Sequence, residues 1–298
     1  MTTGEKIKKL RTEKMMTQSE LVGDHITRNM LSRIESDEAN PSLGTLLYLA
    51  SRLNVPAGYL LADEKEDKIY AKSFAIDNIK LAYKSGDYKI CRRLCLEFDG
   101  DDDEVRFLLV QSSFELASEQ FRNGKLKRAV AYFDEAISYA VESEYYAVNI
   151  LAASCMYLRY MRRFSPNLSS DVIDENTVEH FCAMDNDFCR YIYALECLEN
   201  LQTDFAATYV KEGETDSPTV LHIGARVDMM HSNYRIAFIK LREILTNNRE
   251  VSYPVLYDVF CDLEECAKLT NDFRSAYEYS KSRMDLLQRM LEDRKSVV

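Results

Sequence analysis

The chain has 298 residues, which is enough for a small domain followed by a larger one. Its net charge is −11 and its pI is about 5.0, so a uniformly charged molecule of this composition would repel nucleic acid. No apolar run approaches membrane-spanning length and no signal-peptide core is present, so we expect a cytoplasmic protein without a membrane partner. The eight cysteines show no Cys-x-x-Cys spacing, which predicts neither disulfides, nor a metal, nor a cofactor.

The charge is distributed unevenly along the chain. Residues 1–62 hold eight Lys/Arg and seven Asp/Glu, which leaves 30 basic and 42 acidic residues in the remainder. Contact with double-stranded DNA is therefore expected from a basic face of the first segment, formed by Lys6, Lys8, Lys9, Lys14, Arg28 and Arg33. Because one weakly charged segment offers few phosphate contacts, we expect a homodimer that reads two half-sites.

The first segment predicts two helices before residue 23. Ile7 and Leu10 fall at helical spacing, which indicates an amphipathic helix with a basic outer face. Thr17 and Glu20 have the spacing of a capping box, so a short second helix is expected to begin there.

The third predicted helix carries residue types that read DNA. Thr27 can cap it, and Leu31 and Ile34 are expected to face inward. Two helices joined by a tight turn, the second with Arg and Asn near its start, are typical of a helix-turn-helix, because these side chains pair with guanine and adenine. The glutamine that opens the second helix is expected to donate to a phosphate. The candidate DNA-binding residues are Gln18, Thr27, Arg28, Asn29, Ser32 and Arg33.

Two more helices complete this segment. The turn at residues 40–42 precedes a fourth helix, which we expect to bury Leu43, Leu46, Leu47, Leu49 and Ala50. Pro56 opens a short fifth helix.

This stretch resembles the XRE (lambda-repressor-like) helix-turn-helix family. The residues that carry the resemblance are Lys9-Leu10-Arg11, Thr17-Gln18-Ser19-Glu20-Leu21, Leu31-Ser32-Arg33-Ile34-Glu35, Asn40-Pro41-Ser42-Leu43 and Leu60. The resemblance implies a five-helix DNA-binding domain, here residues 1–63, in which Arg11 pairs with Glu35. One departure is a turn between the second and third helices about one residue shorter than the family's common pattern.

Beyond a charged, helical linker at 64–72, residues 73–298 show a repeat and no strand alternation. The recurring turn sequences are Gly86-Asp87-Tyr88, Gly124-Lys125-Leu126, Ser232-Asn233-Tyr234 and Asn271-Asp272-Phe273, with a fainter copy at Thr203-Asp204-Phe205-Ala206. Small residues follow at Cys91, Ala129, Ala237 and Ala276. Tyr88, Leu126 and Phe164 repeat every 38 residues, as expected for stacked helical hairpins, whereas residues 165–186 break the period.

The best copy, with Leu126, Ala129, Phe133 and Ala136, resembles a tetratricopeptide (TPR) repeat. We therefore expect an all-α protein, with a TPR-like α-solenoid of about five or six hairpins after the DNA-binding domain. The concave surface of such a solenoid binds extended peptides. Candidate residues there are Asn149, Tyr157, Arg190, Arg226, Asp258 and Asp262, although charged residues on such helices are usually just solvated.

The whole layout resembles the Rgg/PlcR (RRNPP) group of bacterial regulators. The resemblance implies a dimer that binds promoter DNA and whose repeat domain receives a short imported signalling peptide. The group's peptide-gripping asparagines are not matched, since Ala194, Ile223 and Asp262 stand at the equivalent depth.

The leading hypothesis is therefore a sequence-specific transcriptional regulator, homodimeric and switched by a signalling peptide. The alternative is a DNA-tethered TPR scaffold that docks a protein partner and is not regulated by a peptide. Enzymatic activity is not expected, because no nucleophile–base pair, phosphate-cradling glycine loop or His-Glu-x-x-His helix appears in the sequence.

Overall fold

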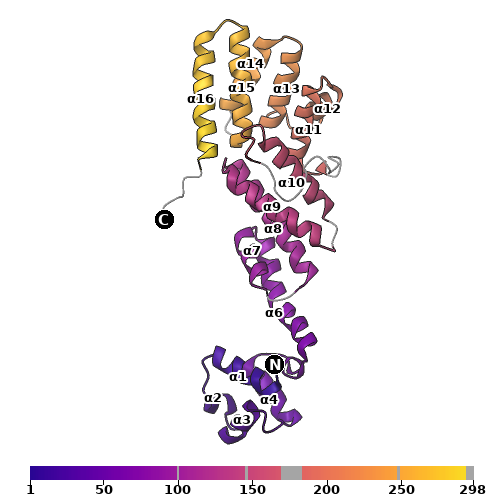
Figure 1. Cartoon of the computed structure of the whole chain (residues 1–298), viewed down its shortest axis with the longest axis vertical. Coiled ribbons are helices and arrows are strands. Elements are labelled where there is room, and N and C mark those ends of the chain that lie inside the picture. The colour runs from indigo at the N-terminus through magenta and orange to yellow at the C-terminus, as the bar shows by residue number, and fades with distance from the viewer. Residues whose placement is uncertain (99–100, 145–146, 169–182, 247–248, 293–298) are drawn as a thin grey trace. The chain divides into compact units, whose positions relative to one another are not determined.

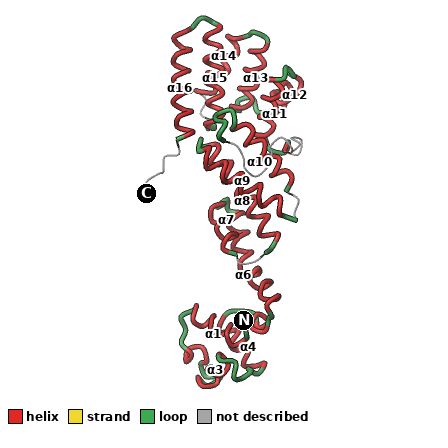
Figure 2. The backbone as a smooth tube through the Cα atoms, viewed as in Figure 1, coloured by secondary structure: helices red, strands yellow, loops and turns green. Residues whose placement is uncertain are grey.

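The computed structural model describes residues 1–98, 101–144, 147–168, 183–246 and 249–292. Within these ranges the chain forms sixteen helices and no strand (Figures 1 and 2), so the prediction of an all-α protein is confirmed. In the same ranges, no helix combines the length and the apolar character needed to cross a bilayer.

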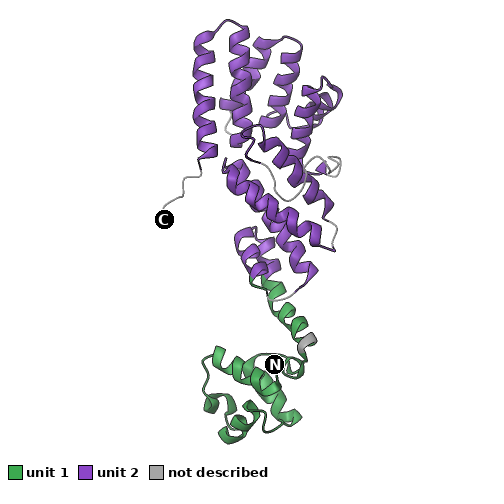
Figure 3. Ribbon diagram, in the orientation of Figure 1, with its two compact units in different colours: residues 1–78, 97–100 green, residues 79–96, 101–298 purple. Residues whose placement is uncertain are grey.

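The chain divides into two compact units (Figure 3). The first comprises residues 1–78 and a short segment near residue 97, and the second comprises the rest. Five helices precede the linker: α1 (Thr3–Glu13), α2 (Gln18–Val22), α3 (Arg28–Glu35), α4 (Leu43–Leu53) and α5 (Ala57–Leu61). The predicted linker at 64–72 is the beginning of α6 (Glu64–Lys84), which continues without a break past residue 72.

The second unit is a succession of helices. They are α7 (Tyr88–Glu97), α8 (Asp103–Arg122), α9 (Leu126–Glu142), α10 (Val148–Met161), α11 (Asp187–Glu199), α12 (Asp204–Glu212), α13 (Pro218–Met230), α14 (Tyr234–Thr246), α15 (Tyr253–Leu269) and α16 (Phe273–Leu291). From α8 onward, consecutive helices pack on one another, most extensively α8 on α9, α13 on α14 and α15 on α16. The second unit is therefore a helical repeat.

The core of the first unit is made by one stripe of each short helix. Fully buried members are Ile7, Leu21, Leu31, Ile34, Leu49, Leu53 and Leu60. Leu43 and Leu47 were also expected to be buried, and this was wrong: they are 70% and 52% exposed. A single helix face covers the core, and on α4 that face is filled by Leu46, Leu49 and Ala50.

The hairpin turns of the second unit share one backbone geometry. Gly86, Gly124, Ser232 and Asn271 have φ values of 75°, 69°, 60° and 62°. At each site the next N–H donates to the carbonyl five residues earlier, as at Asp87 to Ala82 (3.0 Å), which is the Schellman closure of a helix. The fainter copy has the same closure, with Leu201 at φ 61° before α12.

The small residues that follow these turns are buried, as the repeat pattern predicts. Cys91, Ala129 and Ala237 are 0% exposed, and Ala276 is 4% exposed. Phe164 does not fit the pattern, because it lies after the end of α10 and begins no helix. Most of the segment that interrupts the period lies outside the described residues.

Candidate DNA-binding surface and a polar network in the repeat body

The predicted reading helix forms as expected. The Thr27 side chain caps α3 by accepting a hydrogen bond from the backbone N–H of Met30 at 3.2 Å. Leu31 and Ile34 are buried, while the opposite face of α3 is exposed. Five of the six predicted DNA-binding side chains lie exposed at this face or its cap: Thr27, Arg28, Asn29, Ser32 and Arg33.

The sixth residue, Gln18, connects α3 to a buried ion pair. Arg11 donates to both carboxylate oxygens of Glu35, at 2.6 and 3.1 Å, so the pairing implied by the family resemblance is present. The Gln18 amide nitrogen donates to Glu35 at 2.8 Å, and its amide oxygen accepts from Arg28 Nε at 3.3 Å. Gln18 is half-buried and holds Arg28, which its predicted role as a phosphate donor did not include.

Arg11 is the charged group at the buried end of this series of hydrogen bonds. The hydrogen bond to Glu35 raises the pKa of Arg11 and outweighs the opposing effect of burial. A planar guanidinium that meets a carboxylate with two bonds is fixed in orientation. Glu35 and Gln18 therefore transmit a rigid arrangement from the core to the Arg28 side chain.

The expected basic face differs at one position. Lys6 is 1% exposed, and its ammonium donates to the carbonyls of Tyr59 (3.1 Å) and Ala62 (2.7 Å) and to the carboxylate of Asp67. Its place on the DNA-facing surface was therefore predicted wrongly. Lys8, Lys9 and Lys14 are exposed as expected.

The residues predicted for the concave surface fall into three groups. Asn149 is exposed, and Arg190 is half-buried and pairs with Glu212 at 2.9 Å. Tyr157 is instead a core residue that is 5% exposed. Its ring centroid lies 5.0 Å from those of Phe121 and Phe133.

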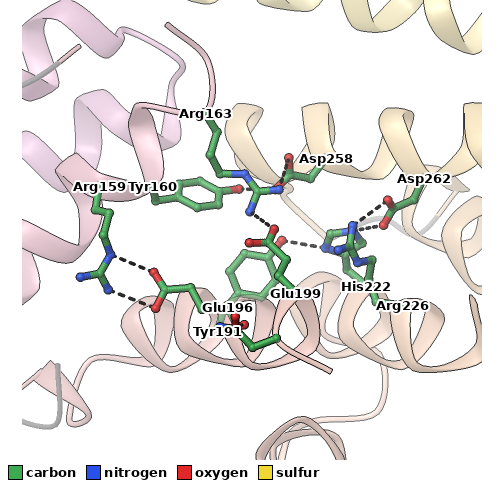
Figure 4. Close-up of polar contacts among 11 residues, drawn as sticks. Arg159, Tyr160, Arg163, Tyr191, Glu196, Glu199, His222, Arg226, Asp258 and Asp262 are labelled. Carbon is green, nitrogen blue, oxygen red and sulfur yellow. Dashed lines mark hydrogen bonds and ion pairs between the residues drawn. The ribbon is translucent and has the colours of Figure 1, made fainter. Parts of the chain in front are cut away.

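Arg226, Asp258 and Asp262 join a buried polar network that spans α10, α11, α13 and α15 (Figure 4). Asp262 accepts from His222 Nε2 at 2.9 Å and from Arg226 Nη1 at 3.0 Å. The other ring nitrogen of His222 meets the Tyr191 hydroxyl at 2.7 Å. Burial acts to raise the pKa of Asp262, but the hydrogen bonds and charges of His222 and Arg226 together hold that pKa below its ordinary value.

The second buried carboxylate behaves in the opposite way. Asp258 is 5% exposed, accepts from the Tyr160 hydroxyl at 2.7 Å and lies 3.8 Å from an Arg163 nitrogen. Burial raises the pKa of Asp258 because the Arg163 charge compensates only part of the lost hydration. Arg163 also donates to Glu199 at 3.0 Å (Figure 4).

Few features of the amino-acid sequence indicate this network. Asp258 and Asp262 were expected to face a ligand, whereas the structure shows both paired within the protein. Tyr160, Arg163, Tyr191 and His222 were not predicted as members. The one usable signal was His222, a polar residue in the apolar stretch 220–225, since a buried histidine requires partners.

The described residues also bear on the predictions about metal sites and cysteines. No group of three or more His, Cys, Asp or Glu side chains is arranged to hold a metal ion there. The cysteines within those ranges form no disulfide with one another, and Cys182 lies outside them. Burial raises the pKa of Cys189 and Cys266 to about 12, so both remain protonated at neutral pH.

Comparison with known proteins identifies the first unit. Residues 7–60 match the model of a family described as helix-turn-helix. A relative, the immunity repressor protein of Bacillus phage phi105, is 37% identical over 65 residues, which are 22% of this chain and 45% of the relative. The chain thus spans less than half the length of this curated relative.

Solved structures align along the full length but with low scores. One is PlcR of Bacillus thuringiensis in complex with the peptide PapR7 and DNA, with 16% identity, 98% of this chain and 99% of that chain covered, and a TM-score of 0.26. Another is ComR of S. thermophilus in complex with DNA and its signalling peptide ComS, with 14% identity, 96% and 99% coverage, and a TM-score of 0.23. Scores this low support no structural argument.

Proposed function

Since residues 7–60 are a helix-turn-helix domain of the XRE type, we propose that this chain is a sequence-specific, DNA-binding transcriptional regulator. The observation that carries the proposal is the exposed face of α3, where Arg28 and Asn29 follow the capped end of the helix and Ser32 and Arg33 continue the same face toward its other end. Arginine and asparagine in these positions suit bidentate pairing with guanine and adenine in the major groove.

Base discrimination tests this assignment. Full-length Arg28→Ala and Arg33→Ala variants are titrated against a bound duplex and its single base-pair substitutions. Each should lose about 1–3 kcal/mol of discrimination at one base pair and little elsewhere. The matched control is Lys211→Ala, which removes an exposed charge in the second unit. A uniform loss of affinity over all sequences would instead assign both arginines to phosphates.

The proposal extends to a homodimer whose repeat body binds a short signalling peptide. A helical repeat offers a concave surface for an extended chain, and Asn149, Arg190 and Arg226 reach solvent at least in part. A peptide would change DNA affinity only by its differential affinity for the two shapes of the repeat. The buried residues Tyr157, Asp258 and Asp262 would support such a surface from behind.

Sedimentation and peptide titration test this extension. The free chain should sediment as a dimer, and a labelled duplex should change affinity when a cognate short peptide is added. Asn149→Ala and Arg190→Ala should weaken that response, with Lys211→Ala as control. A library of synthetic short peptides that leaves both DNA affinity and dimer geometry unchanged would end the peptide proposal and leave the DNA-binding one intact.

A second function is favoured by a separate observation. Several large apolar side chains of the last helices are exposed, including Ile239 (67%), Phe273 (67%) and Tyr277 (72%). Phe273 and Tyr277 are four residues apart on α16 and so share one helix face, and contiguous exposed apolar surface is typical of protein-binding sites. In this alternative the body is a scaffold that docks a protein partner at DNA. A stoichiometric protein that copurifies with the chain favours the scaffold, and a copurifying peptide favours the switch.

A further inference from the structure

The buried lysine of α1 joins three structural elements of the first unit. Lys6 lies on α1, its two carbonyl acceptors belong to the last turn and end of α5, and its carboxylate partner, Asp67, lies in the first turn of α6. The three protons of its ammonium thus have three acceptors, and the cation also lies 5.2 Å from the centre of the Tyr59 ring.

The α6 side of this joint is a continuous face. Asp67, Tyr70 and Phe74 follow one another at spacings of three and four residues, so they share one side of the helix. The Tyr59 ring meets Tyr70 at 5.6 Å and Phe74 at 5.4 Å, both edge to face. A Cβ atom on Gly58 would lie 2.3 Å from the Tyr70 hydroxyl, so the glycine permits this close approach.

We infer that the Lys6–Asp67 pair is a lock that fixes the beginning of α6 to the DNA-binding domain and thereby sets the spacing between operator half-sites. Tyr59, Tyr70 and Phe74 supply the packing around it. The second part of the inference rests on the proposed dimeric DNA binding. Lys6 and Asp67 act as positioning residues, because the direction in which α6 leaves the domain is determined within the first unit.

Burial distinguishes this lock from an ordinary surface pair. The Lys6 side chain is 1% exposed and that of Asp67 is 27% exposed. Exposed ion pairs contribute little, whereas removing one partner of a buried pair leaves an uncompensated charge and is strongly destabilising. A Lys6 side chain that bound a phosphate would have to abandon all three acceptors, so the lock and a DNA contact exclude each other.

Hydrogen exchange of the full chain without DNA tests the lock directly. In Lys6→Met and Asp67→Ala, amides around residues 59–74 should exchange about tenfold faster than in the wild type, as expected for the loss of charged hydrogen bonds. Lys8→Met and Lys68→Ala remove exposed charges beside the two residues and should exchange like the wild type. Should Lys6→Met unfold the whole first unit, Asp67→Ala decides, because it leaves Lys6 both carbonyls. Exchange at the wild-type rate in Asp67→Ala overturns the lock.

Duplexes with two half-sites at graded separations test the consequence. The wild type should prefer one separation, and in Asp67→Ala the ratio of affinities between best and worst separations should fall toward one, while binding to a single half-site stays unchanged. An unaltered ratio overturns the spacing role. If the wild type binds no duplex at all, the proposed function fails, and the exchange experiment still decides whether the lock exists.

Discussion

Arg28 illustrates how a long surface side chain is prepared for recognition. A free arginine loses rotamer entropy when it binds, and this cost lowers affinity. Here the guanidinium is held at 3.3 Å by the Gln18 amide, which is itself held at 2.8 Å by Glu35. The path ends at the half-buried Arg11, so the exposed Arg28 side chain is oriented from the core of the domain.

This arrangement predicts that Gln18 and Arg28 are energetically coupled. Gln18→Ala should reduce discrimination at the base pair that Arg28 reads, and should change little in an Arg28→Ala background. The coupling in a double-mutant cycle of duplex affinities should be about 0.5–3 kcal/mol, as for residues in one hydrogen-bond network. Additive effects of the two substitutions would show that Gln18 acts separately, for example on a phosphate.

At the scale of single elements, the repeated turns show where backbone conformation limits stability. Leu201 adopts φ 61° although its side chain is 81% exposed, so burial of the side chain does not offset the backbone strain. A left-handed residue other than glycine costs roughly 1–2 kcal/mol of stability. Glycine avoids this strain but loses about 0.5–1 kcal/mol because its unfolded chain has more conformational entropy. Leu201→Gly should therefore stabilise the protein by up to about 1 kcal/mol in urea unfolding. A destabilising effect would contradict this account of the turn.

The two turn glycines provide a matched pair. An added Cβ at Gly86 meets nothing within 4 Å, whereas at Gly124 it would lie 3.0 Å from atoms of Met290 and Tyr253. Both residues have positive φ, so both alanine variants are strained by about 1–2 kcal/mol. Gly124→Ala should be the more destabilising in urea unfolding because it also displaces its neighbours. Equal losses would show that the close contact is relaxed at no cost.

The caps and turns of these elements could be predicted from sequence because they depend on residues three to five positions apart. Thr17, Thr27 and the four turn sequences all behave as expected. Which side of a helix is covered depends instead on neighbours distant in sequence. For this reason Leu43 was expected to be buried and Lys6 exposed, and both expectations were wrong.

The same limit applied to the candidate sites. The α3 face could be predicted because its residues lie within two turns of a recognisable cap. The polar network could not, since His222 and Asp262 are 40 residues apart and meet only when α13 packs beside α15. Sequence spacing placed Asp258 and Asp262 on one helix face, but it could not show that neighbouring helices cover that face.

On the scale of the whole repeat body, the two buried carboxylates predict opposite responses to pH. The pKa of Asp262 is lowered in the folded state, so its ionisation stabilises the fold above the ordinary aspartate pKa of about 3.9 and this stability is lost as the pH falls through that region. The pKa of Asp258 is raised, so its contribution declines as the pH rises above the same value.

Urea unfolding between pH 3 and 7 checks these signs. Asp262→Asn should remove part of the loss of stability on acidification, and Asp258→Asn should remove part of the loss on raising the pH. Identical pH profiles for the two variants would contradict the assignment of opposite signs.

For the complete molecule, the net charge of −11 must be reconciled with the proposed binding of DNA by the helix-turn-helix domain. Residues 1–62 are nearly neutral and the rest is acidic, so phosphate contact depends on the exposed Lys8, Lys9, Lys14, Arg28 and Arg33. Few contacts of this kind give an affinity that falls with salt, and base readout by α3 must supply the specificity.

The most direct measurement is selection of the purified full chain on a pool of random duplexes at low salt, followed by sequencing of the bound fraction. We predict enrichment of one short sequence by the wild type, with the preference at one base pair relaxed in Arg28→Ala. A bound fraction with the composition of the starting pool, or identical enrichment by the wild type and Arg28→Ala, would contradict the central claim that α3 reads DNA.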